Sequence, residues 1–134
     1  MKTAKNTLSV VAGIAAAIVT FLIGEYINAS IFPAPTTLDY KDADAVKTFY
    51  NNQPLTVWVL VLITWAIGSF LCGLLIKLIS KSNRNMLPLI AGVLLTLSGI
   101  LNIFSLPHPT WFIVVGLLIF IPSVLMGHKT LKSY

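Results

Sequence analysis

The sequence predicts an all-α integral membrane protein, a four-helix up-down bundle with a short amphipathic helix in the outer loop between the first and second helices. Three observations support this fold class. Of the 134 residues, 57% are hydrophobic and only 10% are charged, whereas soluble domains carry about 25% charged residues. Four apolar segments are long enough to cross a bilayer, and the basic residues gather near alternate ends of these segments. At this length we expect one transmembrane domain over residues 1–134.

The four apolar segments cover residues 7–31, 55–79, 87–106 and 110–127. A hydrocarbon core of about 30 Å requires about 20 helical residues. Because lipid cannot satisfy backbone polar groups, we expect each segment to be a helix. The joints between the last three segments are short, so consecutive helices are expected to be antiparallel neighbours.

The first segment has a second interpretation, as a secretory signal peptide, because it follows two lysines and ends near "INAS". Its apolar run is longer than the usual core of a signal peptide, and it contains Glu25 near its end. We therefore expect it to be a retained first helix.

The outer loop, residues 32–54, contains the stretch "DYKDADAVKTFY", whose apolar side chains recur with helical spacing. These side chains are Ala43, Val46, Phe49 and Tyr50. The pattern predicts a short amphipathic helix with Asp39 or Thr37 as its N-cap. Its simpler role is an interfacial anchor, and the alternative is a lid over a site.

Small residues at helical spacing predict close packing of the four helices. They are Gly13, Ala17, Thr20 and Gly24 in the first segment, Ser69 and Gly73 in the second, and Gly92, Thr96 and Gly99 in the third. Pro122 is expected to bend the fourth helix. The single cysteine, Cys72, excludes an internal disulfide and a thiolate zinc site, and it is expected to fill space in the bundle.

The basic residues predict the orientation of the chain. Seven of the nine lie on one side of the membrane: Lys2, Lys5, Lys77, Lys81, Arg84, Lys129 and Lys132. Only Lys41 and Lys47 fall in the outer loop. The positive-inside rule therefore predicts a multi-pass protein of the cell inner (plasma) membrane with both termini in the cytoplasm.

Glu25 is the only acidic residue inside the four apolar segments. It lies six residues before the end of the first segment, which is about 9 Å below that end. Three explanations are open for a carboxyl at this depth. It is protonated, it reaches toward the headgroups, or it has polar partners inside the bundle.

Polar and aromatic residues at matching depth supply candidate partners for this carboxyl. The predicted ligand-binding residues are Glu25, Asn28, Trp58, Trp65, Asn102, Ser105, His108 and Trp111. We hypothesise that Glu25, Asn102 and His108 converge beneath the outer loop, with Pro107 and Pro109 fixing the position of the histidine. Such a cluster is either a binding pocket or a structural clasp that fixes the register of the helices.

The sequence favours a non-enzymatic function. It contains no catalytic motif of the Gly-x-Ser-x-Gly or HExxH type, no phosphate loop and no spacing typical of metal ligands, so we predict no catalytic residues, metal or cofactor. The basic residues lie at helix ends, which indicates anionic lipid headgroups and not nucleic acid as their partners.

The expected function is the binding of a partner helix, a lipid or a small amphiphile in an outer-leaflet pocket around Glu25, Asn102 and His108. Its expected partners are membrane lipid and a second membrane protein or further copies of the chain. The alternative is an oligomeric proton-coupled small transporter in which Glu25 exchanges a proton. An intramembrane enzyme ranks third.

Overall fold

The computed structural model describes residues 2–105 and 107–131, and within these residues it contains five α-helices and no strand. The helices are α1 (Lys2–Ile31), α2 (Ala43–Asn51), α3 (Leu55–Ser80), α4 (Met86–Ser105) and α5 (Thr110–Thr130). All except α2 are long and apolar enough to cross a membrane. The prediction of an all-α protein with four membrane-spanning helices is therefore confirmed. Leu106, the predicted last residue of the third span, lies outside the described residues.

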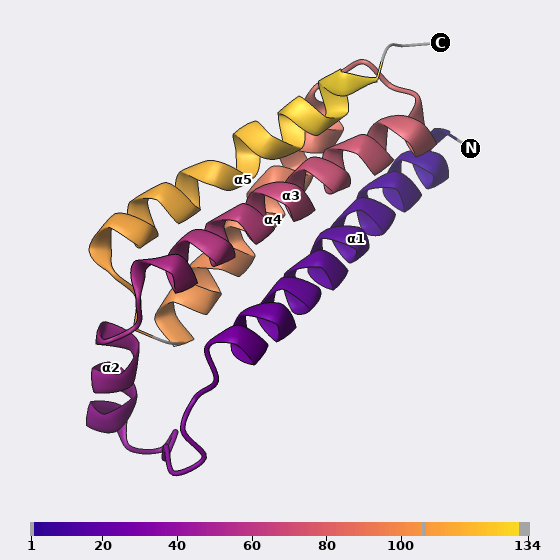
Figure 1. Cartoon of the computed structure of the whole chain (residues 1–134). Coiled ribbons are helices and arrows are strands. Elements are labelled where there is room, and N and C mark those ends of the chain that lie inside the picture. Colours follow the sequence, from indigo (N-terminus) through magenta and orange to yellow (C-terminus); the bar gives the residue numbers. More distant parts are fainter. Residues whose placement is uncertain (1, 106, 132–134) are drawn as a thin grey trace.

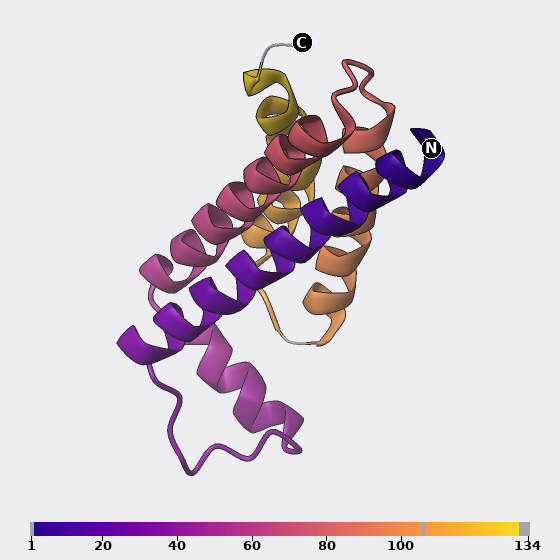
Figure 2. The same ribbon diagram turned by 90° about the vertical axis from the view of Figure 1, so that its right-hand side faces the viewer.

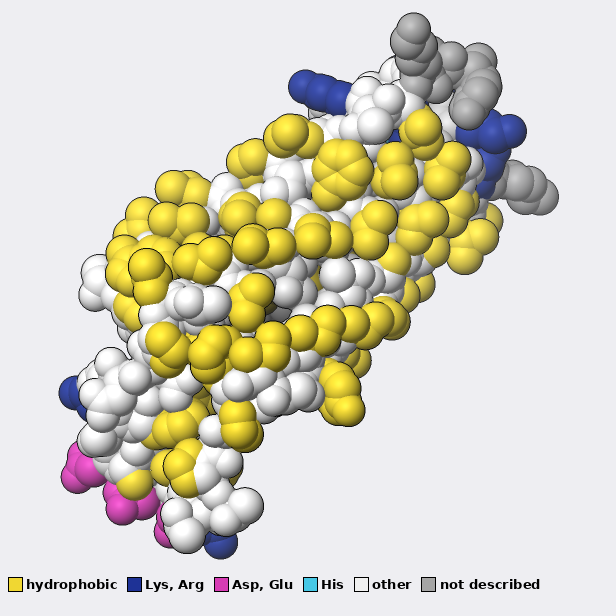
Figure 3. Space-filling view, in the orientation of Figure 1, with side chains coloured by type: hydrophobic (Ala, Val, Ile, Leu, Met, Phe, Trp, Pro, Cys, Tyr) yellow, Lys and Arg dark blue, Asp and Glu magenta, His cyan; other side chains and the backbone are white. Residues whose placement is uncertain are grey.

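The four long helices form an elongated bundle in which α2 lies at one end (Figure 1). We call this the cap end. The α3–α4 joint, residues 81–85, and the start of α1 lie at the opposite end, which we call the basic end. We call residues 32–54, which include α2, the cap. Hydrophobic side chains cover the body between the two ends, and the visible acidic side chains gather on the cap (Figure 3).

The central helix of the bundle is α3, which packs on α1 along one side and on α5 along the other. Helix α4 packs mainly on α5. The spans alternate in direction, as expected for an up-down bundle. However, the consecutive helices α3 and α4 make few contacts with each other, whereas α3 packs closely on α5, which runs in the same direction. Helices α1 and α4 separate toward the cap end (Figure 2).

Glycines explain why α3 prefers α5. A Cβ atom on Gly73 would overlap the carbonyl oxygen of Val124, and one on Gly127 would overlap the carbonyl oxygen of Phe70. The two backbones therefore touch, which is how small residues drive helix association in lipid. A similar approach joins α1 to α3, where a Cβ on Gly13 would lie 2.8 Å from the Cys72 carbonyl oxygen.

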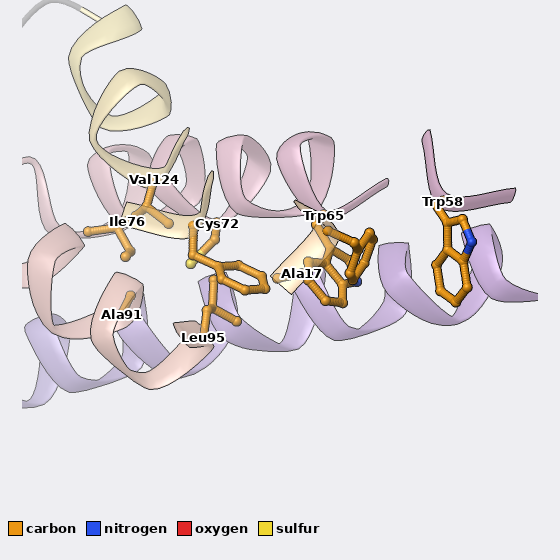
Figure 4. Close-up of a cluster of buried hydrophobic side chains, with 10 residues drawn as sticks. Ala17, Trp58, Trp65, Cys72, Ile76, Ala91, Leu95 and Val124 are labelled. Carbon is orange, nitrogen blue, oxygen red and sulfur yellow. The ribbon is translucent and has the colours of Figure 1, made fainter. Parts of the chain in front are cut away.

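The core is a continuous row of buried side chains along the bundle axis (Figure 4). Trp58 and Trp65 occupy its cap half, and Cys72 and Ile76 continue it toward the basic end. Cys72 is fully buried. It fills space among apolar side chains, as expected from the sequence.

Helix α2 starts later than the sequence predicted. Its N-cap is Asp42, whose Oδ1 accepts hydrogen bonds from the backbone N–H groups of Asp44 and Ala45. The predicted caps Asp39 and Thr37 are wrong, because Asp39 instead accepts a hydrogen bond from the Lys41 backbone and closes a turn before the helix. Val46 is the buried residue of this helix.

Candidate functional site

A hydrogen bond from Asn28 joins α1 to the start of α3 at the cap end. Its Nδ2 donates a hydrogen bond of 3.2 Å to the carbonyl oxygen of Val57. The other end of the same amide, Oδ1, is buried and has no hydrogen-bond partner among the described residues. This predicted site residue therefore has a structural contact, which places one polar group of α1 on the face that meets α3.

A cluster of aromatic rings lies next to this contact. Its centre is Trp58, which is only 5% exposed. The centroid of the Trp58 ring system lies 5.4 Å from the His108 ring, 5.3 Å from the Phe112 ring and 6.2 Å from the Tyr50 ring. His108 stacks on Phe112 at 5.1 Å and 20°. We call Tyr50, Trp58, His108 and Phe112 the ring cluster.

The local sequence explains how the ring cluster forms. Pro109 is the N-cap of α5, and Pro54 is the N-cap of α3. The contact between Trp58 and Phe112, each near the start of its helix, places the two starts at a similar level. His108 lies just before α5 and stacks on Phe112 of its first turn. Tyr50, near the end of α2, reaches Trp58 from the cap. The ring cluster thus joins the cap to α3 and α5.

Tyr50 was predicted as an aromatic wall of the site, whereas Phe112 was not among the predicted site residues. Phe112 is fully buried. His108 precedes α5, so no helical spacing in the sequence relates it to Phe112. Trp65 is a core residue: it stacks on Phe120 at 5.0 Å and meets Phe112 at 5.2 Å.

Glu25 is exposed on the surface of α1, and Asn102 is exposed on α4. Their convergence with His108 beneath the outer loop stays a prediction. The face of α1 that meets α3 carries Gly13 and Gly24. Glu25 follows Gly24 by one residue, and therefore points about 100° away from that contact.

Glu25 also has an electrostatic effect on Tyr50 at the end of α2. Burial raises the pKa of the Tyr50 phenol above its usual value of 10.0, and Tyr40 and Glu25 raise it further.

The remaining predicted site residues lie at the rim of the bundle. Ser105 is exposed, and its hydroxyl donates to the carbonyl oxygen of Leu101 within α4. Trp111 is 41% exposed, and its ring meets Phe112 edge-on at 6.1 Å. This position suits an aromatic anchor at a membrane interface.

Two surface hollows stand out, and neither is lined by Glu25, Asn102 or His108. One is an open depression of about 570 Å³ on the cap, lined by residues including Leu38 and Phe49. The other lies beside Pro122 on α5. Among residues 2–105 and 107–131, no group of three His, Cys, Asp or Glu side chains is placed to hold a metal ion.

Comparison of the chain with protein-family models, with curated proteins and with solved structures gave no match.

Proposed function

We propose that this protein is a non-enzymatic membrane protein that binds a partner transmembrane helix along α1, with Glu25 as the polar contact. The observation that carries the proposal is the exposure of Glu25 on a helix long and apolar enough to span a membrane. A carboxyl that faces hydrocarbon costs several kcal/mol unless it is protonated or hydrogen-bonded. A donor side chain on a partner helix would offset that cost.

The exposed face of α1 also has the spacing that a partner helix requires. Its residues recur at alternating intervals of four and three, and every one of them is exposed: Ala4, Leu8, Val11, Ala15, Ile18, Leu22, Glu25 and Ala29. We call this set the α1 seam. Such a heptad rhythm is typical of two helices that pack side by side along their length. A lipid or a small amphiphile has no need of this periodicity.

The α1 seam points away from α3, because it lies on the opposite side of α1 from Gly13 and Ala17. A partner therefore reaches it without any change in the bundle. Asn102, exposed at the cap end of α4, is a second polar group on the surface at a comparable level.

A photo-crosslinking amino acid at position 22 in living cells tests the proposal. Leu22 belongs to the α1 seam and is 60% exposed. We expect a discrete protein adduct, either with a second copy or with another membrane protein, which mass spectrometry identifies. The matched control is position 97 on α4, where Leu97 is 51% exposed and lies outside the seam. Lipid adducts alone at both positions would contradict the proposal.

Two substitutions of Glu25 separate helix binding from proton-coupled transport, the second candidate. Glutamine keeps a donor and an acceptor, so Glu25→Gln should retain the crosslink, whereas Glu25→Leu should reduce it. In a proton-coupled transporter, Glu25→Gln should abolish uptake into liposomes, because an amide cannot exchange a proton. Loss of proton-driven uptake with an unchanged crosslink to a second copy would favour the transporter.

We further propose that the basic end lies in the cytoplasm of a cell with an inner (plasma) membrane. Five exposed basic residues lie at this end: Lys2, Lys5, Lys81, Arg84 and Lys129. The asymmetry supports this orientation by the positive-inside rule.

A further inference from the structure

Two basic side chains are buried beside each other near the basic end. Lys77 on α3 is 5% exposed, and His128 on α5 is 1% exposed. The close approach of α3 to α5 brings them together. A Cβ on Gly73 would lie 2.8 Å from the backbone nitrogen of His128, and Lys77 follows Gly73 by one turn on the same face.

None of the four Asp and Glu side chains lies near this pair. The four acidic residues of the whole sequence are Glu25, Asp39, Asp42 and Asp44, all in the cap half. At 1.5 Å per residue, Glu25 lies about 35 Å along α1 from the basic end. Buried charges in proteins are normally paired. The ends of α3 and α5 offer only about half a negative charge each.

The polar contacts of the pair leave hydrogen-bonding capacity unused. The Lys77 ammonium donates to Oδ1 of Asn83, an exposed residue of the α3–α4 joint. The His128 ring hydrogen-bonds the main chain of Ser82. Its Nε2 is buried and has no partner among the described residues. A neutral amide oxygen thus serves as the acceptor for a buried ammonium group, beside an unpartnered imidazole nitrogen.

We propose that Lys77 and His128 form a binding site for the phosphate group of an anionic lipid in the leaflet at the basic end. A phosphate oxygen would take the place of Asn83 Oδ1 on the ammonium group and supply the missing negative charge. His128 would take up a proton from solvent on binding, so that its Nε2–H donates to a second phosphate oxygen. Asn83 is exposed on a short joint, so its side chain can turn away and open the site. This site is separate from the α1 seam and does not rest on the proposed function.

The level of the pair in the bundle suits a headgroup. Lys77 lies three residues before the end of α3, which is about 4.5 Å inside that end. A lysine at this depth directs its ammonium group to the interface, where lipid phosphates lie. Three exposed basic residues around the joint attract anionic lipid to the same surface: Lys81, Arg84 and Lys129.

Native mass spectrometry of the full chain, titrated with phosphatidylglycerol or phosphatidylcholine in micelles, tests the site. We expect a preference for phosphatidylglycerol and a loss of about thirtyfold in its affinity for Lys77→Gln, since a hydrogen bond to a charged group is removed. The matched control Arg84→Gln removes an exposed charge from the same joint and should cost about fivefold. Equal losses for the two variants would overturn the proposal, because surface charge alone would then explain the binding.

A second variant keeps the test decisive if Lys77→Gln fails to fold. Asn83→Ala removes the competing acceptor without touching either basic side chain, so it should strengthen phosphatidylglycerol binding about threefold. Weaker binding would overturn the proposal. Inorganic phosphate serves as a competitor in the final experiment. If it displaces phosphatidylglycerol at equal concentration, the site binds a free anion and the lipid assignment is wrong.

Discussion

Gly73 of α3 lies in direct contact with the backbone of Val124 on α5, so that there is no room for a methyl group between the two helices. Gly73→Ala should therefore force α3 and α5 apart, because the obstacle is a carbonyl oxygen and not a flexible side chain. Overpacking of a core typically costs about 1–3 kcal/mol, and we expect a loss of folding free energy near the upper limit. Thermal unfolding in detergent micelles measures it.

Gly92→Ala is the matched control for this substitution. A Cβ at Gly92 would lie 3.0 Å from a side-chain carbon of Ile121, which can shift, and 3.2 Å from the Ile121 Cα atom, a much milder approach than the overlap at Gly73. We expect a loss well below that of Gly73→Ala. Equal losses would show that the contact between α3 and α5 is no tighter than the contact between α4 and α5.

Asn28→Ala should weaken the attachment of α1 to α3. It removes the hydrogen bond from Asn28 to the Val57 carbonyl oxygen. Hydrogen bonds between helices in membranes contribute about 0.6 kcal/mol on average, so the expected loss of stability is of that order. Asn102→Ala, at an exposed position of α4, should leave the unfolding midpoint unchanged. A larger effect for Asn102 than for Asn28 would contradict this assignment.

Trp58→Ala should release the cap from the bundle, because Trp58 is the ring that joins Tyr50 to His108 and Phe112. Removal of a buried tryptophan costs about 3–5 kcal/mol in protein cores. Limited proteolysis within residues 32–42 reports on the cap, and we expect faster cleavage there. Trp111→Ala removes a tryptophan that is 41% exposed, and cleavage should stay at the wild-type rate.

The sequence was sufficient to predict the four spans, because a run of about 20 apolar residues has few alternatives to a membrane helix. It also predicted five glycines that face other helices, since small residues at intervals of three or four share one face, but it missed Gly68, Gly116 and Gly127. The start of α2 could not be chosen in the same way. Asp39 and Asp42 both suit an N-cap, and only the backbone turn at Asp39 decides between them.

The convergence of Glu25, Asn102 and His108 stays a prediction for a different reason. Position along a helix gives the depth of Glu25 and Asn102 in the membrane, but contact also requires the right side of each helix. Glu25 points about 100° away from Gly24, which faces α3. Helices α1 and α4 also separate toward the cap end (Figure 2). Asn102 is exposed on α4. Depth alone is therefore insufficient to decide whether the three residues converge.

Alkaline pH should destabilise the cap through Tyr50. Because burial raises the pKa of this phenol in the folded state, the folded chain holds the proton more tightly than the unfolded chain. The contribution to stability is complete below about pH 10 and decreases as the pH rises through the higher pKa of the folded state. Proteolysis within residues 32–42 should therefore accelerate above about pH 10. Tyr50→Phe should remove this dependence, and an unchanged pH profile would contradict the assignment.

Cysteine labelling in intact cells tests the proposed orientation. The native Cys72 is fully buried, so the unmodified chain should stay unlabelled by a membrane-impermeant maleimide and serves as its own background. Asp44→Cys places a thiol on the exposed surface of α2, and Lys129→Cys places one at the basic end. We expect labelling at position 44 in intact cells and at position 129 only after the membrane is permeabilised, because the positive-inside rule holds the basic end in the cytoplasm. Labelling of position 129 alone in intact cells would contradict the proposed orientation and indicate the opposite one.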